Sequence, residues 1–197
     1  MKKLAIFDLD GTLLYTLEDL HASTNFALES EGLPARSLDE VRRFVGNGIR
    51  KLIERAVPDG CAPDVTDRVF AAFKRHYAEN CMVLTRPYPG IPEMLDALKA
   101  RGWKLGVVSN KADEPVKALI AHYFPGVFDS VVGERENVRK KPAPDSVFET
   151  VGSLGCDIGQ AVYIGDSDVD GQTAANAGCD CILVSWGFRG RETLLSY

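Results

Sequence analysis

The 197-residue chain lacks the basic excess typical of general nucleic-acid binders, since 28 acidic residues outnumber 23 lysines and arginines and the net charge is −5. It has no apolar run long enough to span a membrane. Its five cysteines form no CxxC pair, and an odd number does not suit a disulfide framework. We therefore expect free thiols, a cytoplasmic location, and neither a nucleic-acid nor a membrane partner.

Four short apolar runs predict the buried strands of a parallel sheet, because they lack the alternation of a half-exposed strand. They lie at 4–7, 105–108, 161–164 and 181–184, with a weaker fifth at 130–132. Helical patterns at 92–100, 114–122 and 145–154 alternate with them. This alternation predicts an α/β fold with a doubly wound, mostly parallel sheet.

Residues 15–82 interrupt this alternation. They contain helix-like runs at 17–31, 38–44, 48–57 and 65–79 and no convincing strand. We therefore predict an α/β catalytic core of residues 1–14 and 83–197, with a small helical cap of residues 15–82 inserted after the first strand.

Polar clusters follow the predicted strands. Asp8 and Asp10 end the first strand, Ser109-Asn110-Lys111 ends the second, and Gly165-Asp-Ser-Asp-Val-Asp170 ends a later one. Ligands of open α/β sheets bind beyond the carboxyl ends of the strands, so we expect these clusters to meet in space.

The residue types in these clusters suit a phosphate group. Asp8 and Asp166 can hold a small hard cation such as Mg²⁺, which prefers oxygen ligands. Lys141 adds a positive charge, Ser109 adds a hydroxyl donor, and a free carboxylate can attack or move protons. Each cluster alone has an ordinary structural explanation, such as helix capping or a solvated lysine pair. Their occurrence together in this order favours a phosphate site.

The clusters together resemble the motifs of the haloacid dehalogenase-like hydrolase superfamily. DLDGTL at 8–13 is similar to its first motif, Ser109 to the second, Lys141 within KKPAP to the third, and GDSDVD at 165–170 to the fourth. The stretch VRRFVGNGIRKLIERAV at 41–57 resembles the cap segment of the phosphoglycolate phosphatase-like group. One departure is Tyr15, where many relatives carry an aspartate.

The resemblance implies a reaction and a set of roles. Asp8 would be the nucleophile that becomes an aspartyl phosphate, and Asp10 would protonate the leaving group and then activate water. Mg²⁺ would be held by Asp8, the backbone carbonyl of Asp10, and Asp166. The remaining members of the site would be Asp170 in support of the metal, and Ser109, Asn110 and Lys141 around the phosphate.

We therefore predict a Mg²⁺-dependent phosphatase that hydrolyses a small-molecule phosphate monoester, with phosphoglycolate as the leading substrate. Asn47 and Arg50 are candidates for contacting the substrate from the cap, although Arg50 suits a solvated helix position equally well. The sequence does not indicate an oligomeric state.

Three other functions are considered. A halide-removing enzyme of the same fold is disfavoured, because Asp10 supplies an acid/base group that those relatives lack. A sugar phosphomutase of the same superfamily would place a cap histidine near His21, but His21 is displaced by one residue, a rotation of roughly 100° on a helix. A phosphoacceptor signalling module has its acceptor aspartate on a middle strand, where this chain has Ser109.

Overall fold

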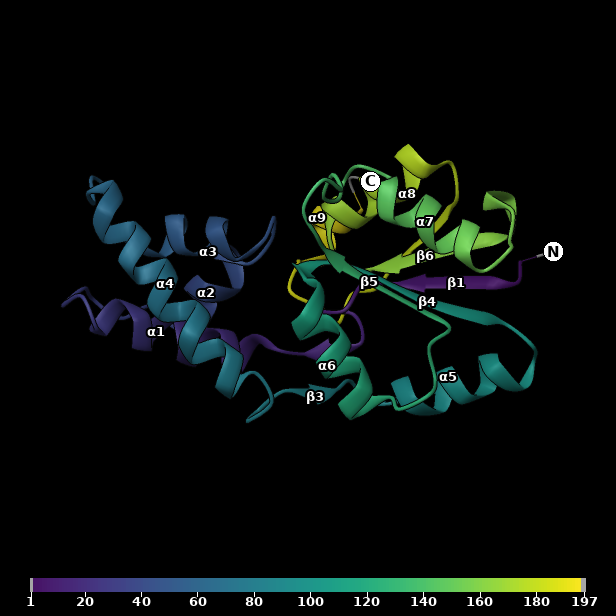
Figure 1. The fold of residues 1–197 in the computed structure, drawn as a ribbon, viewed down its shortest axis with the longest axis horizontal. Helices are drawn as coiled ribbons and strands as arrows, with labels where there is room; N and C mark the ends of the chain where they lie inside the picture. Colours follow the sequence, from purple (N-terminus) through teal and green to yellow (C-terminus); the bar gives the residue numbers. More distant parts are fainter. Residues whose placement is uncertain (1, 196–197) are drawn as a thin grey trace. The chain divides into compact units, whose positions relative to one another are not determined.

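In the computed structural model, which describes residues 2–195, β1 (Leu4–Phe7) is the central strand of a five-stranded sheet (Figure 1). All pairings in this sheet are parallel, and the strand order is β5-β4-β1-β6-β7. The other strands are β4 (Lys104–Ala112), β5 (Ser130–Glu134), β6 (Ala161–Gly165) and β7 (Asp180–Leu183).

Helices cover both faces of this sheet (Figure 1). One face carries α5 (Ile91–Ala100) and α6 (Asp113–Tyr123), and the other carries α7 (Asp145–Ser153) and α8 (Asp168–Ala177). Apolar side chains of β1, β4, β5 and β6 form one buried cluster with α7 and α8, because alternate residues of a strand point to the same face of the sheet. The predicted fold class is confirmed. A 3₁₀ turn (Ile158–Gln160) precedes β6, and a short helix, α9 (Arg191–Leu194), follows β7.

Two strands differ from their predictions. The apolar run at 181–184 predicts a buried strand, but β7 is the edge of the sheet and Ile182 is 53% exposed. Apolar runs occur on edge strands too, and the run alone does not tell the position in the sheet. The second strand is longer than predicted, so Ser109, Asn110 and Lys111 lie within β4 and not after it.

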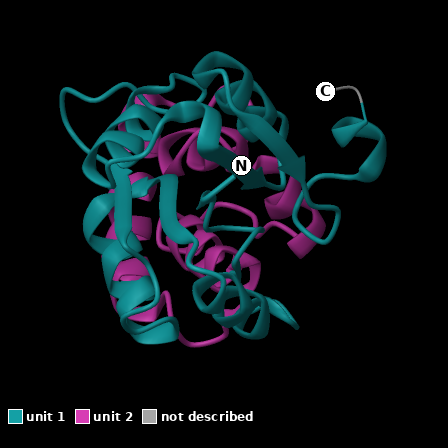
Figure 2. Ribbon diagram, turned by 90° about the vertical axis from the view of Figure 1, so that its right-hand side faces the viewer, with its two compact units in different colours: residues 1–15, 87–197 teal, residues 16–86 magenta. Residues whose placement is uncertain are grey.

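The chain divides into two compact units: unit 1 comprises residues 1–15 and 87–197, and unit 2 comprises residues 16–86 (Figure 2). A short ribbon pairs β2 (Leu14–Tyr15) with β3 (Arg86–Pro87), at the two points where the chain passes from one unit to the other. The ring of Tyr15 packs edge-on against Tyr88 of the same unit, with centroids 5.9 Å apart. That the units act as a catalytic core and a cap stays a prediction.

Apart from its share of that ribbon, unit 2 has only helices and connecting loops among the residues described. Its helices are α1 (Leu17–Glu29), α2 (Leu38–Phe44), α3 (Ile49–Ala56) and α4 (Pro63–Asn80). Helix α1 packs along α4, and their buried faces include Leu28 and Phe73. Ser37 and Glu40 form a capping box that fixes the start of α2.

The five cysteines are free thiols, as predicted. None of the helices within residues 2–195 combines the length and the apolar character that a membrane span requires.

Candidate active site

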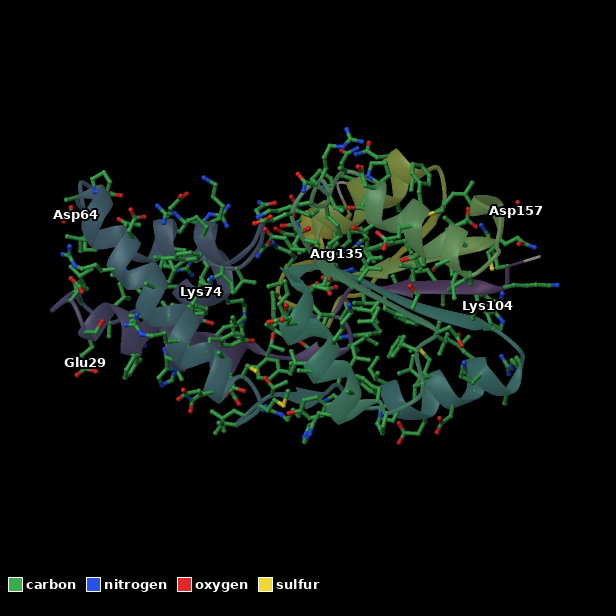
Figure 3. All side chains as sticks on the ribbon, in the orientation of Figure 1. Glu29, Asp64, Lys74, Lys104, Arg135 and Asp157 are labelled. Atoms are coloured by element: carbon green, nitrogen blue, oxygen red, sulfur yellow. The ribbon has the colours of Figure 1, made fainter. Side chains whose placement is uncertain are left out.

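The predicted site residues of unit 1 gather at the carboxyl edge of the sheet. In Figure 3, Lys104 marks the amino-terminal start of β4, and Arg135, just past β5, marks the carboxyl edge. Asp8 directly follows β1, and its backbone N–H donates to the carbonyl of Ile164 at 2.9 Å. This bond continues the pairing of β1 with β6 and fixes the backbone of Asp8 at the edge.

A tight loop follows Asp8. The carbonyl of Leu9 accepts the N–H groups of Leu13 and Leu14, both at 3.0 Å, and the side chain of Leu9 is fully buried. Gly11 has φ +90°, and a Cβ atom there would lie 2.4 Å from Oδ2 of Asp166. Glycine is therefore required at this position, both for its backbone conformation and for the close approach of Asp166.

Lys141 links two buried carboxylates. Its Nζ lies 2.9 Å from Oδ1 of Asp8 and 2.8 Å from Oδ1 of Asp170, and it also donates to the hydroxyl of Tyr163 at 3.0 Å. Its side chain is almost completely buried. A buried ammonium is tolerated only when it is paired in this way. The structure thus brings the third predicted motif onto the first and the fourth.

Asp170 is held by hydrogen bonds from its own loop. Its Oδ2 accepts from the backbone N–H of Asp166 at 3.2 Å, and from the N–H and the hydroxyl of Ser167 at 3.1 and 2.6 Å. Ser167 also caps the start of α8 and forms a capping box with Asp170. Both oxygens of Asp170 are therefore occupied, one by Lys141 and one by this loop.

Burial and repulsion between carboxylates raise the pKa values of Asp8 and Asp166. The pKa of Asp8 rises to about 8, first because burial removes water from the carboxylate and then because Asp170 and Asp166 are close, while Lys141 acts in the opposite direction. The pKa of Asp166 rises to about 7, mainly through burial and the charge of Asp170. Burial alone would lower the pKa of Lys141, but the negative charges of Asp170 and Asp8 outweigh it. The pKa of Lys141 therefore lies well above its ordinary value, and its charged form is favoured.

These carboxylates fit a divalent cation. Oxygens of Asp8, Asp166 and Asp170 lie within 4.8 Å of one another, and all three residues are buried. A cation would offset the repulsion that raises the pKa values of Asp8 and Asp166. Asp170 already accepts from Lys141 and from its own loop, and Asp166 accepts from the backbone N–H of Phe188. That Asp8 and Asp166 are direct ligands, with Asp170 in support, stays a prediction.

Ser109 and Asn110 also lie in this site. Ser109 is buried, and its hydroxyl accepts the N–H of Lys111 at 3.2 Å. The side chain of Asn110 forms two hydrogen bonds with the backbone of Lys141: its amide donates to the carbonyl at 3.0 Å, and its oxygen accepts the N–H at 2.8 Å. Asn110 therefore fixes the segment that carries Lys141.

A family model of haloacid dehalogenase-like hydrolases matches residues 5–184. The chain belongs to this family. A phosphoglycolate phosphatase of Aquifex aeolicus (strain VF5) is 36% identical over 187 residues, covering 94% of this chain and 86% of that protein. Another, from Rhodospirillum rubrum, is 36% identical and covers 100% of this chain and 84% of its own length.

Solved structures agree with the family assignment. A phosphoglycolate phosphatase candidate from Lactobacillus delbrueckii subsp. bulgaricus has a TM-score of 0.94 and 37% identity, with 100% of this chain and 92% of that chain covered. CbbY from Rhodobacter sphaeroides, solved with phosphate, has a TM-score of 0.75 and 26% identity, with 97% and 89% covered. The predicted enzyme class, a phosphatase of the haloacid dehalogenase type, is confirmed.

Several residues contact the predicted site residues in ways that the sequence does not predict; Lys111 belongs to a predicted polar cluster, but no role is expected for it. Lys111 pairs with Asp10 at 2.9 Å. The backbone N–H of Phe188 donates to Oδ2 of Asp166 at 2.7 Å, and the indole of Trp186 donates to the carbonyl of Thr12 at 3.1 Å. Between Trp186 and Phe188, Gly187 lies against Asp166, since a Cβ atom at Gly187 would lie 2.3 Å from Oδ2 of Asp166. A single glycine in the sequence does not predict this contact.

The two candidates in unit 2 differ, since Arg50 has acidic partners within that unit and Asn47 is marked by its backbone conformation. Arg50 lies at the surface, 3.1 Å from Glu54 and 2.5 Å from Asp67. Asn47 adopts a left-handed backbone with φ 62° in the loop before α3. A substrate contact by either residue stays a prediction. His21 Nε2 lies 2.9 Å from the carbonyl oxygen of Arg36, in keeping with a structural role.

Proposed function

We propose that this haloacid dehalogenase-like hydrolase is a Mg²⁺-dependent phosphatase that acts on a small phosphate monoester through a phosphoenzyme on Asp8. The observation that carries the proposal is the buried contact of Asp8 with Lys141, beside Asp166 and Asp170. Three buried carboxylates share this cluster with the single ammonium of Lys141, and an additional cation would offset the excess of negative charge.

In the first half of the proposed reaction, a carboxylate oxygen of Asp8 attacks phosphorus. The bond from phosphorus to the leaving oxygen breaks, and Asp10 gives its proton to that oxygen. In the second half, Asp10 takes a proton from water, the water oxygen attacks phosphorus, and the bond from phosphorus to Asp8 breaks. Phosphate is released and the Asp8 carboxylate is restored.

The other residues position and neutralise the phosphoryl group, which is most of what phosphoryl transfer requires. Lys141 and Ser109 would bind its oxygens, and Asn110 holds the backbone of Lys141 in place. When bound, Mg²⁺ supplies positive charge to the phosphoryl oxygens. Asp8, Asp166 and the backbone carbonyl of Asp10 would hold it, supported by Asp170.

Phosphoglycolate is the substrate that we propose first. Support comes from relatives named phosphoglycolate phosphatase, which share about a third of their residues with this chain over most of its length. Under this proposal, Asn47 and Arg50 of unit 2 read the substrate carboxylate. A panel of phosphate monoesters together with pyrophosphate, an anhydride, would rank phosphoglycolate against sugar phosphates, nucleotides and pyrophosphate when phosphate release is measured for each.

Rapid mixing with nitrophenyl phosphate tests the nucleophile. Nitrophenolate leaves without a proton, so Asp10→Asn should still phosphorylate Asp8 but hydrolyse the phosphoenzyme slowly. We expect a burst of nitrophenolate near one equivalent, then a slow phase, and acid-quenched protein with phosphate on Asp8. With phosphoglycolate, whose alkoxide needs a proton, the same variant should show no burst.

The Asp8→Asn variant is the control, because a neutral amide is a poor nucleophile and should give no burst with either substrate. A burst from Asp8→Asn, or phosphate trapped on Asp10, would reverse the assignment. A sugar phosphomutase would instead convert a sugar phosphate to its isomer with little net release of phosphate. Phosphoenzyme that forms but never turns over in the native protein would favour the signalling module.

A further inference from the structure

Lys111 is a buried cation that the proposed reaction does not use. Its side chain is 3% exposed, and its Nζ lies 2.9 Å from Oδ1 and 3.1 Å from Oδ2 of Asp10. Asp10 itself is 18% exposed, so it is the solvent-facing member of the pair. An ammonium at this depth has a desolvation cost that an apolar side chain would avoid, so its retention calls for an explanation.

We propose that Lys111 is a positioning residue that fixes the carboxylate of Asp10 for proton transfer to the leaving group and from water. The inference rests on the proposed function, since it assigns Lys111 to the acid/base half of that reaction. Proton transfer requires the carboxylate to lie within hydrogen-bond reach of the reacting oxygen. Donation by Lys111 to both carboxylate oxygens fixes the plane of the group as well as its place.

The end of β4 supports this role, because its polar residues each reach a different part of the site. Asn110 holds the backbone of Lys141, and Lys111 holds the side chain of Asp10. The N–H of Lys111 donates to the Ser109 hydroxyl, which ties the two residues together. A single strand end thus sets the position of the proposed phosphate-binding lysine and of the acid/base carboxylate.

A leaving-group comparison tests the inference. In Lys111→Met, we expect a nitrophenolate burst near one equivalent. Its rate should stay within about threefold of the rate at which the native protein forms the phosphoenzyme, because that step needs no proton. Hydrolysis of the phosphoenzyme and turnover of an alkyl phosphate should both fall about 100-fold, the lower range of general acid–base effects. Lys111→Arg, which keeps the charge, should recover most of the loss.

Lys117→Met is the matched control, since Lys117 pairs with Asp113 at the surface of the same unit. It should leave both steps unchanged. If Lys111→Met does not fold, as judged by circular dichroism, Lys111→Gln takes its place, with the same expectations.

A double variant separates positioning from a general structural role. If Lys111 acts through Asp10, then Asp10→Asn combined with Lys111→Met should hydrolyse the phosphoenzyme no more than about threefold slower than Asp10→Asn alone. The inference would be overturned if the losses of the two single variants multiplied in the double variant. It would also be overturned if Lys111→Met lowered the burst rate and the hydrolysis of the phosphoenzyme equally. Absence of phosphate on Asp8 in the native protein would instead overturn the proposed function, so the two failures are distinguishable.

Discussion

The two units place their charges differently. Among the residues that the structure describes, unit 1 buries five charged side chains, all of them in or beside the candidate site, and unit 2 buries one, Asp19. The five are Asp8, Lys111, Lys141, Asp166 and Asp170. Buried charges are costly even when they are paired, so their concentration in unit 1 indicates a functional requirement.

The charges of unit 2 lie mostly on its surface. Many pair along one helix, as Arg50 does with Glu54 and Arg68 does with Asp64, four residues apart. Such exposed pairs contribute little to stability, and their contribution weakens with salt. Burial, and not the distance from nitrogen to oxygen, distinguishes the ion pairs of the candidate site, since the pairs of both units are equally short.

The largest expected effect comes from two adjacent lysines that differ in burial. Lys141→Met removes the charge beside Asp8 and should lower turnover about 1,000-fold, in the range observed when a donor to transition-state charge is lost. Lys140 is exposed and pairs with Glu134, so Lys140→Met should stay within about twofold of the native rate. Steady-state kinetics checks both, and the opposite ranking would show that the wrong lysine is assigned to the phosphate.

Asp19, the buried charge of unit 2, predicts a loss of stability. Its carboxylate accepts the backbone N–H groups of Leu84 at 2.9 Å and Thr85 at 2.9 Å, which ties the start of α1 to the segment after α4. Asp19→Ala leaves these donors without the carboxylate and should lower the unfolding free energy by about 2–3 kcal/mol. Glu18→Ala removes only an exposed pair with Arg86 and should cost at most about 1 kcal/mol. Urea denaturation distinguishes the two, and equal losses would contradict the assigned role of Asp19.

Metal binding should depend on pH because the raised pKa values belong to proposed ligands. Asp8 and Asp166, with pKa values of about 8 and about 7, must lose their protons before they bind Mg²⁺. The affinity for Mg²⁺ should therefore rise at least tenfold from pH 6 to pH 7. Fluorescence of Trp186, in a Trp103→Phe background, reports this directly, since its indole contacts the Thr12 carbonyl beside the site. An affinity independent of pH would contradict the assigned ligands.

The same shifts fix the sign of the stability change without Mg²⁺. The folded state keeps protons that the unfolded state has already lost between about pH 4 and pH 8. These two groups therefore lower the unfolding free energy of the metal-free protein as pH rises through that range, and Mg²⁺ should offset the loss. Thermal unfolding at pH 5 and pH 8, with and without Mg²⁺, measures both effects.

The smallest expected effect lies on the surface of unit 2. If Arg50 reads a substrate carboxylate, Arg50→Ala should raise KM for phosphoglycolate several-fold and hardly change the hydrolysis of an uncharged aryl phosphate. Arg68 is a matched control, because it also has two acidic partners on the same unit, Glu31 and Asp64. Arg68→Ala should alter neither substrate. Equal changes for both substrates would assign Arg50 to the fold.

Features of the site that depend on local sequence could be predicted. The bounds of β1 match their prediction, and the aspartates that follow β1 and β6 gather as the topology requires. The position of a polar cluster after an apolar strand is a property of a few adjacent residues. Its convergence with other clusters follows from parallel strands ending at one edge.

Features that depend on packing could not be predicted. The pair of Lys111 with Asp10 joins residues 101 positions apart. Its place after an apolar strand predicts that Lys111 lies near the site, but not that its side chain is buried against Asp10. Asp19 reads as an ordinary acidic residue in the first turn of a helix, a position that the helix dipole favours in any case. The exposure of β7 depends on which strand forms the edge, which the apolar run does not encode.

The ribbon of β2 and β3 bears on how a chain of this kind could change in length. The chain leaves unit 1 after Tyr15 and returns to it at Pro87. Within unit 1, the N–H of Tyr88 donates to the carbonyl of Leu13 at 3.1 Å. The two ends of the insertion are thus neighbours, the arrangement that lets one domain be inserted into another without stretching its host. A longer, shorter or absent insert could be exchanged at this junction while the order of the five strands is preserved.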